Sequence, residues 1–113
     1  MMIAAMALSL LLNPAPAPQE PQPEPHTLYQ QALGCIASAD LMRQAGEGVA
    51  AELDAEILIW GMVMAQFGPA VGRTADEVSR TDVERAQTFF AQMKTTRPAV
   101  FAAHRAYCRA FLP

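Results

Sequence analysis

Apolar residues recur every three or four positions through most of the chain after residue 27, and Gly and Pro separate the segments that carry this pattern. The spacing predicts four helices, over about 28–45, 49–67, 82–95 and from Pro98 onward, with a short helical turn before the third. No stretch alternates apolar and polar residues over the length of a strand. Because the connections are short, neighbouring helices should be antiparallel. The predicted fold class is therefore all-α, a four-helix bundle-like single domain.

Local signals indicate where these helices begin and end. Gly46 follows the first periodic segment and can end it, and Pro98 suits the first turn of the last helix. A capping box pairs Thr at a helix start with Glu or Gln three residues later, and each satisfies a free backbone N–H of the other. The sequence contains three such patterns: Thr27 with Gln30, Thr74 with Glu77, and Thr81 with Glu84.

The second predicted helix has the most regular apolar stripe in the chain. Its members, at spacings of four, three, four and three, are Leu53, Ile57, Trp60, Met64 and Phe67. We expect Trp60 to be the central aromatic residue of the core. Further apolar residues cover much of the remaining circumference: Leu58, Ile59, Met62 and Val63. This helix should therefore be central, or its outer face should meet a partner.

The N-terminal part of the chain differs from the rest. Residues 1–12 are almost entirely apolar, and residues 13–25 contain six of the nine prolines. An apolar run of this length is too short for a membrane-spanning helix, which needs about 20 residues, and is typical of a secretory signal. We therefore predict a signal peptide-like segment over 1–17, a Pro-rich linker over 18–26 and a helical domain over 27–113. The expected location is the periplasm or the extracellular medium.

The processing of this leader stays open. No Lys or Arg precedes the apolar run, and cleavage after the best small-residue pattern, Ala15 to Ala17, would place Pro18 directly after the cut. Proline at that position is a poor substrate for signal peptidases, so the sequence does not define the cleavage site. No Cys follows the apolar run, so we expect no lipid anchor. A buried helix is the structural alternative to export for this segment.

The chain has two cysteines, Cys35 in the first predicted helix and Cys108 in the last. In an antiparallel bundle the start of the first helix lies beside the end of the fourth, so the two can meet. Both lie on apolar faces, and an oxidising compartment favours a structural disulfide. Closing a loop of this length would stabilise the fold by roughly 4 kcal/mol. The alternative is two buried thiols in a cytosolic protein.

The distribution of charge argues against two classes of partner. The net charge is −3, and the eight basic residues alternate with acids along the sequence, whereas nucleic-acid binding needs a basic face. Glu52, Asp54 and Glu56 lead into the apolar part of the second helix and would be repelled by anionic lipid. We therefore expect no nucleic acid and no stable membrane insertion after export.

Few residues in the sequence suggest catalysis or the binding of a metal or cofactor. The two histidines are His26, at the boundary of the linker, and His104, four residues before Cys108. A Cys–His pair can be drawn there, although the same spacing arises when two residues share a core-facing side. Haem ligation by Met42 and His104 would place the ligands at different levels of the bundle. No CxxC, CxxCH, HExxH or Gly-rich phosphate loop is present. The sequence predicts no catalytic residue, metal site or cofactor.

With Cys35 in the first helix, Cys108 in the last and the GRTADEV turn at 72–78 between them, residues 28–112 resemble small exported all-helical two-cysteine proteins of bacteria. The function of those proteins is unassigned. The resemblance is one of layout and has no specific motif, so it carries no functional residue to this chain.

The leading hypothesis is a non-catalytic exported protein that binds another protein, or a second copy of itself, through the outer face of the second helix. The competing hypothesis is an envelope enzyme or cofactor-binding bundle centred on His104 with Cys108 or Tyr107. A free thiol would favour the second hypothesis.

Overall fold

The structure is a computed structural model of the 113-residue chain. It describes residues 24–112, apart from the side chain of Ser79. The predicted signal segment and most of the predicted linker, residues 1–23, lie outside the described residues. Within the described part the chain is helical and forms no strand, which confirms the all-α prediction.

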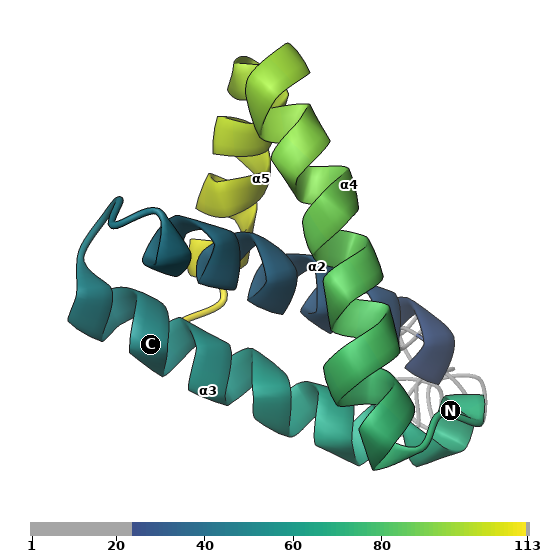
Figure 1. Ribbon diagram of the computed structural model, residues 1–113. Coiled ribbons are helices and arrows are strands. Elements are labelled where there is room, and N and C mark those ends of the chain that lie inside the picture. Colours follow the sequence, from purple (N-terminus) through teal and green to yellow (C-terminus); the bar gives the residue numbers. More distant parts are fainter. Residues whose placement is uncertain (1–23, 113) are drawn as a thin grey trace, which may run out of the picture.

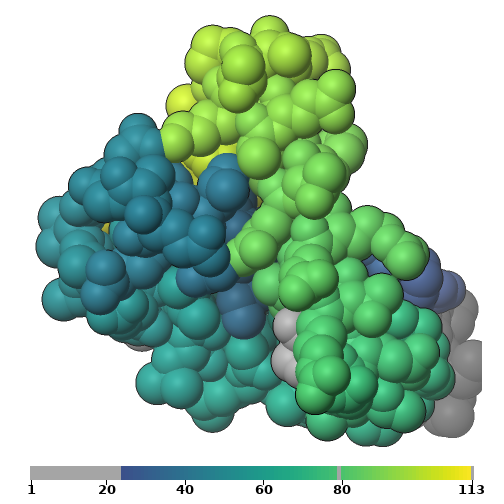
Figure 2. Space-filling view, viewed as in Figure 1, coloured from purple at the N-terminus to yellow at the C-terminus, as the bar shows by residue number. Residues whose placement is uncertain are grey.

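Four α-helices and two shorter helical segments make up the part of the chain that the structure describes. They are α2 (Pro25–Gln44), α3 (Ala50–Phe67), the 3-10 turn η1 (Pro69–Val71), the π-helical segment η2 (Glu77–Asp82), α4 (Val83–Thr96) and α5 (Pro98–Arg109). The first pair, α2 and α3, lies side by side, and the second pair, α4 and α5, crosses it steeply (Figure 1). Figure 2 shows α4 in front of α2. The end of α5 reaches α2 from the other side of this crossing (Figure 1).

The ends of α2 test two of the predicted boundaries. The helix begins at Pro25, three residues before the predicted start, because proline fits the first turn of a helix, where no N–H is needed. Glu24 precedes it in an extended conformation and no side chain caps the helix, so the predicted Thr27 capping box is wrong. Gly46 ends the helix as predicted: it has a φ of 70°, and the N–H of Glu47 donates to the carbonyl of Met42 at 3.0 Å.

The segment before α4 contains one of the other two predicted capping boxes. The N–H of Thr74 donates to Glu77 Oε1 at 3.0 Å, and the N–H of Glu77 donates to Thr74 Oγ1 at 3.2 Å. The Thr81 capping box is wrong, because η2 runs directly into α4 and Thr81 lies inside this continuous helical stretch. A π-helical segment widens a helix locally and often occurs at functional sites. Here it ends at Asp82, which faces α2.

The core lies between α2 and α3 and continues beneath the crossing. The predicted stripe of α3 faces inward: Leu53, Trp60 and Met64 are buried. Trp60, which the sequence predicts to be a core aromatic residue, is buried in the cluster that contains the two cysteines. A second cluster, centred on Phe90 of α4, packs under the crossing. None of the helices between residues 24 and 112 is long and apolar enough to cross a membrane.

Candidate functional site

The predicted disulfide is present. Cys35 and Cys108 are bonded, with their Cα atoms 5.5 Å apart and both side chains fully buried. The bond joins the middle of α2 to the last turn of α5, 73 residues away in sequence. Because the Cys108 sulfur is part of this bond, it has no thiol that could act as a nucleophile. The described residues include no free cysteine.

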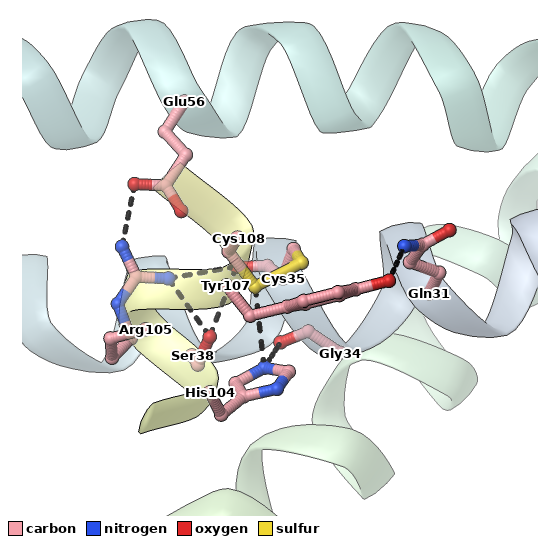
Figure 3. Close-up of a disulfide and its surroundings, with 9 residues drawn as sticks. All are labelled: Gln31, Gly34, Cys35, Ser38, Glu56, His104, Arg105, Tyr107 and Cys108. Carbon is pink, nitrogen blue, oxygen red and sulfur yellow. Dashed lines mark hydrogen bonds and ion pairs between the residues drawn. A yellow bond between two sulfur atoms is a disulfide. The ribbon is translucent and has the colours of Figure 1, made fainter. Parts of the chain in front are cut away.

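His104 lies directly against the disulfide (Figure 3). Its Nε2 atom is 3.2 Å from the carbonyl oxygen of Gly34 and 3.5 Å from the sulfur of Cys108. Its ring stacks on Phe90 of α4 with the ring centroids 4.4 Å apart. Burial lowers the pKa of His104 below its ordinary value, so the ring is neutral at pH 7 and donates its Nε2 proton to Gly34.

Gly34 allows these two rings to approach the backbone of α2. A Cβ atom at this position would lie 3.2 Å from the Phe90 ring and 3.3 Å from the His104 ring, which is closer than ordinary contact. A larger residue would push α4 or α5 away from α2. A glycine inside a helical pattern is a sequence signal of close packing of this kind.

A cleft of about 620 Å³ opens between α2, α4 and α5, with His104 and Gly34 in its lining. Such a volume is within the range of ligand-binding sites in proteins. Four aromatic residues line it: Tyr29, Phe89, Phe90 and Tyr107. The polar side chains around them are His26, Gln30, Gln31, Arg73, Asp82 and Arg85.

A polar cluster closes the end of the cleft near η2. Arg73 donates two hydrogen bonds to Asp82, from Nε at 2.9 Å and from Nη2 at 2.6 Å. The Tyr29 hydroxyl donates to the same carboxylate at 2.5 Å. Desolvation and this contact raise the pKa of Tyr29 to about 12. The hydrogen bonds from Arg73 lower the pKa of Asp82. The cluster attaches the segment before α4 to α2.

This cluster predicts a dependence of stability on pH. The folded-state pKa of Asp82 is below its ordinary value of 3.8, so the folded state favours the ionised carboxylate. The contribution of Asp82 to the free energy of unfolding is fully present above the ordinary pKa of 3.8. It is lost as the pH falls through the lower pKa of the folded state. In urea unfolding series, the stability deficit of Asp82→Asn should be largest at neutral pH and should shrink below pH 4.

Asp54→Asn is the matched control for this series. Asp54 pairs with Arg43, but its side chain is 59% exposed, and exposed ion pairs contribute little. We expect it to follow the wild-type pH profile. A deficit in Asp82→Asn that stays constant from pH 7 to acid pH would contradict the prediction.

A buried ion pair lies on the other side of the disulfide (Figure 3). Arg105 Nη2 of α5 donates to Glu56 Oε2 of α3 at 2.5 Å, and the two side chains are 8% and 1% exposed. Arg105 Nη1 also donates to the Ser38 hydroxyl at 3.0 Å and to the carbonyl of Cys35 at 3.4 Å. These contacts join three helices next to the disulfide.

This ion pair was not predicted, although the positions of Glu56 and Arg105 within the apolar stripes of their helices indicate it. Glu56 lies three residues after Leu53 and four before Trp60, so it belongs to the buried side of α3. Arg105 lies four residues after Phe101 and three before Cys108, so it belongs to the buried side of α5. When each of two apolar stripes contains one charged residue, and the two charges are opposite, the pattern indicates a buried ion pair between the two helices.

The fold brings the predicted cysteine pair and His104 together in one cluster. Candidate ligand atoms of Cys35, His104 and Cys108 all lie within 4.8 Å of one another. His104 and Cys108 are neighbours on α5, but Cys35 comes from α2, some seventy residues earlier in the chain. Local spacing could not reveal the third member.

Only part of the predicted partner face of α3 is exposed in the structure. Leu58 and Met62 are 65% and 64% exposed. Ile59 and Val63 are half-buried, and Val63 packs against the core cluster of the disulfide. Two residues one turn apart therefore remain as an exposed apolar patch on this helix. Single exposed apolar residues are common on protein surfaces.

No protein-family model, curated protein or solved structure matches this chain.

Proposed function

We propose that the protein is an exported, non-catalytic binding protein, and that its cleft between α2, α4 and α5 holds an acidic, proline-containing segment of another protein. The exposed aromatic walls of the cleft carry this proposal. Export is supported by the short apolar leader and by the disulfide, which suits an oxidising compartment.

The apolar side of the proposed interaction comes from aromatic rings. Phe89 and Tyr107 line the cleft and are 59% and 48% exposed, which is unusual for such large side chains. Phe89 packs edge to face on Phe90, and the Tyr107 hydroxyl accepts a hydrogen bond from Gln31. Both rings are therefore supported before a ligand arrives. Aromatic-lined grooves recognise extended proline-containing segments, which lose little conformational entropy on binding.

The polar side of the interaction favours an acidic segment. Arg73 and Arg85 line the cleft together with Asp82. Arg73 pairs with both Asp82 and Glu77, while none of the ion pairs among residues 24–112 involves Arg85, whose charge also lowers the pKa of Asp82. Of the charged side chains that line the cleft, two are basic and one is acidic, in a chain whose net charge is −3. Opposite charge on the partner segment would steer association and select against basic segments.

The test measures binding of a fluorescent peptide of alternating proline and glutamate by anisotropy, with a proline and lysine peptide as the control ligand. We expect the acidic peptide to bind and the basic one not to bind. Phe89→Ala and Arg85→Glu should each weaken binding by about tenfold or more, since a few central aromatic and Arg residues dominate such interfaces. Added salt should weaken binding further.

Two variants separate this site from the exposed patch on α3. Leu58→Glu and Met62→Glu alter that patch without touching the cleft, and both side chains are already exposed. We expect both to bind the acidic peptide as the wild type does. Loss of binding in these variants, with normal binding in Phe89→Ala, would place the interface on α3 and contradict the proposal. Equal binding of both peptides would also contradict it.

A further inference from the structure

We infer that Cys35, His104 and Cys108 form a three-ligand Zn²⁺ site when the disulfide is reduced, so that the metal and the disulfide are alternative occupants of one place in the fold. The observation behind this inference is the convergence of two sulfur atoms and an imidazole nitrogen within 4.8 Å of one another. It is independent of the peptide-binding proposal.

The distance between the nitrogen of His104 and the sulfur of Cys108 suits zinc, and reduction frees the two sulfurs to move apart. With Zn–S of about 2.3 Å and Zn–N of about 2.0 Å, a tetrahedral site separates the nitrogen and sulfur ligands by about 3.5 Å. His104 Nε2 and the sulfur of Cys108 are 3.5 Å apart. The i, i+4 spacing of these two residues on α5 maintains this separation, and Cys35 on α2 adds the third ligand from across the interface (Figure 3). Three protein ligands leave a fourth position for another donor.

The surroundings match a neutral metal centre. Two thiolates balance the charge of Zn²⁺, and the imidazole adds none, so the buried site gains no net charge. The Arg105 guanidinium donates to the carbonyl of Cys35 at 3.4 Å and is paired with the Glu56 carboxylate, so the charged groups beside the site also balance one another. His104 also lines the cleft, which gives the metal a route to the buried sulfurs.

Reduction of the disulfide and binding of Zn²⁺ are two separate steps. A thiol or phosphine reductant supplies two electrons and is itself oxidised, while the S–S bond breaks and each sulfur takes up one proton. Zn²⁺ then displaces both thiol protons and forms two Zn–S bonds and one Zn–N bond. The Nε2 proton that His104 donates to Gly34 moves to Nδ1, so that the Nε2 lone pair faces the metal.

The experiment uses the full chain, oxidised and after reduction with a phosphine, under anaerobic conditions. In native mass spectra with Zn²⁺, the reduced chain should gain one zinc and lose two protons per chain, and the oxidised chain should not bind it. Co²⁺ should give thiolate charge-transfer absorption only in the reduced protein. Cys35→Ser and His104→Ala should each weaken Zn²⁺ binding by more than about 100-fold, because removing a ligand exceeds the effect of removing a group that merely orients one.

His26→Ala is the matched control, because His26 lines the same cleft but lies outside the cluster. It should bind Zn²⁺ as the reduced wild type does. If reduction unfolds the chain, Zn²⁺ should restore the helical circular dichroism of wild type and not of His104→Ala. The inference is overturned if the oxidised chain binds equally well, if Zn²⁺ binding requires His26, if Cys35→Ser or His104→Ala binds as tightly as wild type, or if Zn²⁺ fails to refold an unfolded reduced chain.

Discussion

Replacing Arg105 with Met should lower the free energy of unfolding by about 3–5 kcal/mol, because it leaves the Glu56 carboxylate buried without its counter-charge. The Glu56 side chain is 1% exposed, and its second oxygen, Oε1, has no hydrogen-bond partner among the described residues. Urea unfolding, followed by circular dichroism, measures the change as a lower midpoint at similar slope.

Two further variants show whether this effect belongs to the buried pair. Glu56→Leu combined with Arg105→Met replaces both charges with apolar groups and should recover most of the loss, since no uncompensated charge remains. Arg109→Ala breaks the exposed pair with Glu52, whose side chains are 55% and 54% exposed, and should lower stability by less than about 1 kcal/mol. A similarly small effect of Arg105→Met would show that Glu56 is not held as a buried carboxylate.

The second large effect is that of the disulfide. Replacing both Cys35 and Cys108 with Ala should lower the free energy of unfolding by about 4 kcal/mol, because the unfolded chain is no longer closed into a loop of more than seventy residues. This is a large fraction of the stability of a small domain, typically about 5–15 kcal/mol. The measurement is again urea unfolding, compared between oxidised wild type and the double variant.

The reduced wild type is the control for the disulfide. In the presence of a chelator it should be as unstable as the double Ala variant, because both lack the cross-link and neither holds a metal. A double variant as stable as the oxidised protein would show that helix packing alone holds α5 against α2. Zn²⁺ should raise the stability of the reduced wild type and leave the double variant unchanged, which connects this measurement to the proposed metal site.

The helices could be predicted because their signals are local. The apolar stripe of α3 marks Leu53, Trp60 and Met64 as buried, and they are. Gly46 marks a helix end and Pro98 marks a helix start, because each has a backbone preference of its own. The capping box at Thr27 failed because Pro25 starts the helix earlier in the chain. Where two signals for a helix start lie close together, only one of them sets the boundary.

The candidate site could be predicted only in part. The pairing of Cys35 with Cys108 follows from there being two cysteines on apolar faces of the first and last helices. The neighbourhood of His104 does not follow, because Gly34 and Phe90 reach it from two other helices. Of the two exposed rings of the cleft, Tyr107 was named as a candidate beside His104, whereas Phe89 was not. Phe89 and Phe90 are adjacent in sequence and point in different directions on α4, so that Phe90 is buried against Gly34 and His104 while Phe89 is exposed in the cleft.

By itself, the sequence determined the all-α class, the approximate extent of each helix, the inward face of α3 and the cysteine pair, because helical periodicity and backbone preferences act over a few residues. Only the tertiary structure decided how the two helix pairs cross. That crossing buries Glu56 against Arg105, brings Cys35 to His104 and opens the cleft, and each of these contacts joins residues about fifty or seventy positions apart. Such contacts depend on the packing of whole helices, which no short stretch of sequence encodes.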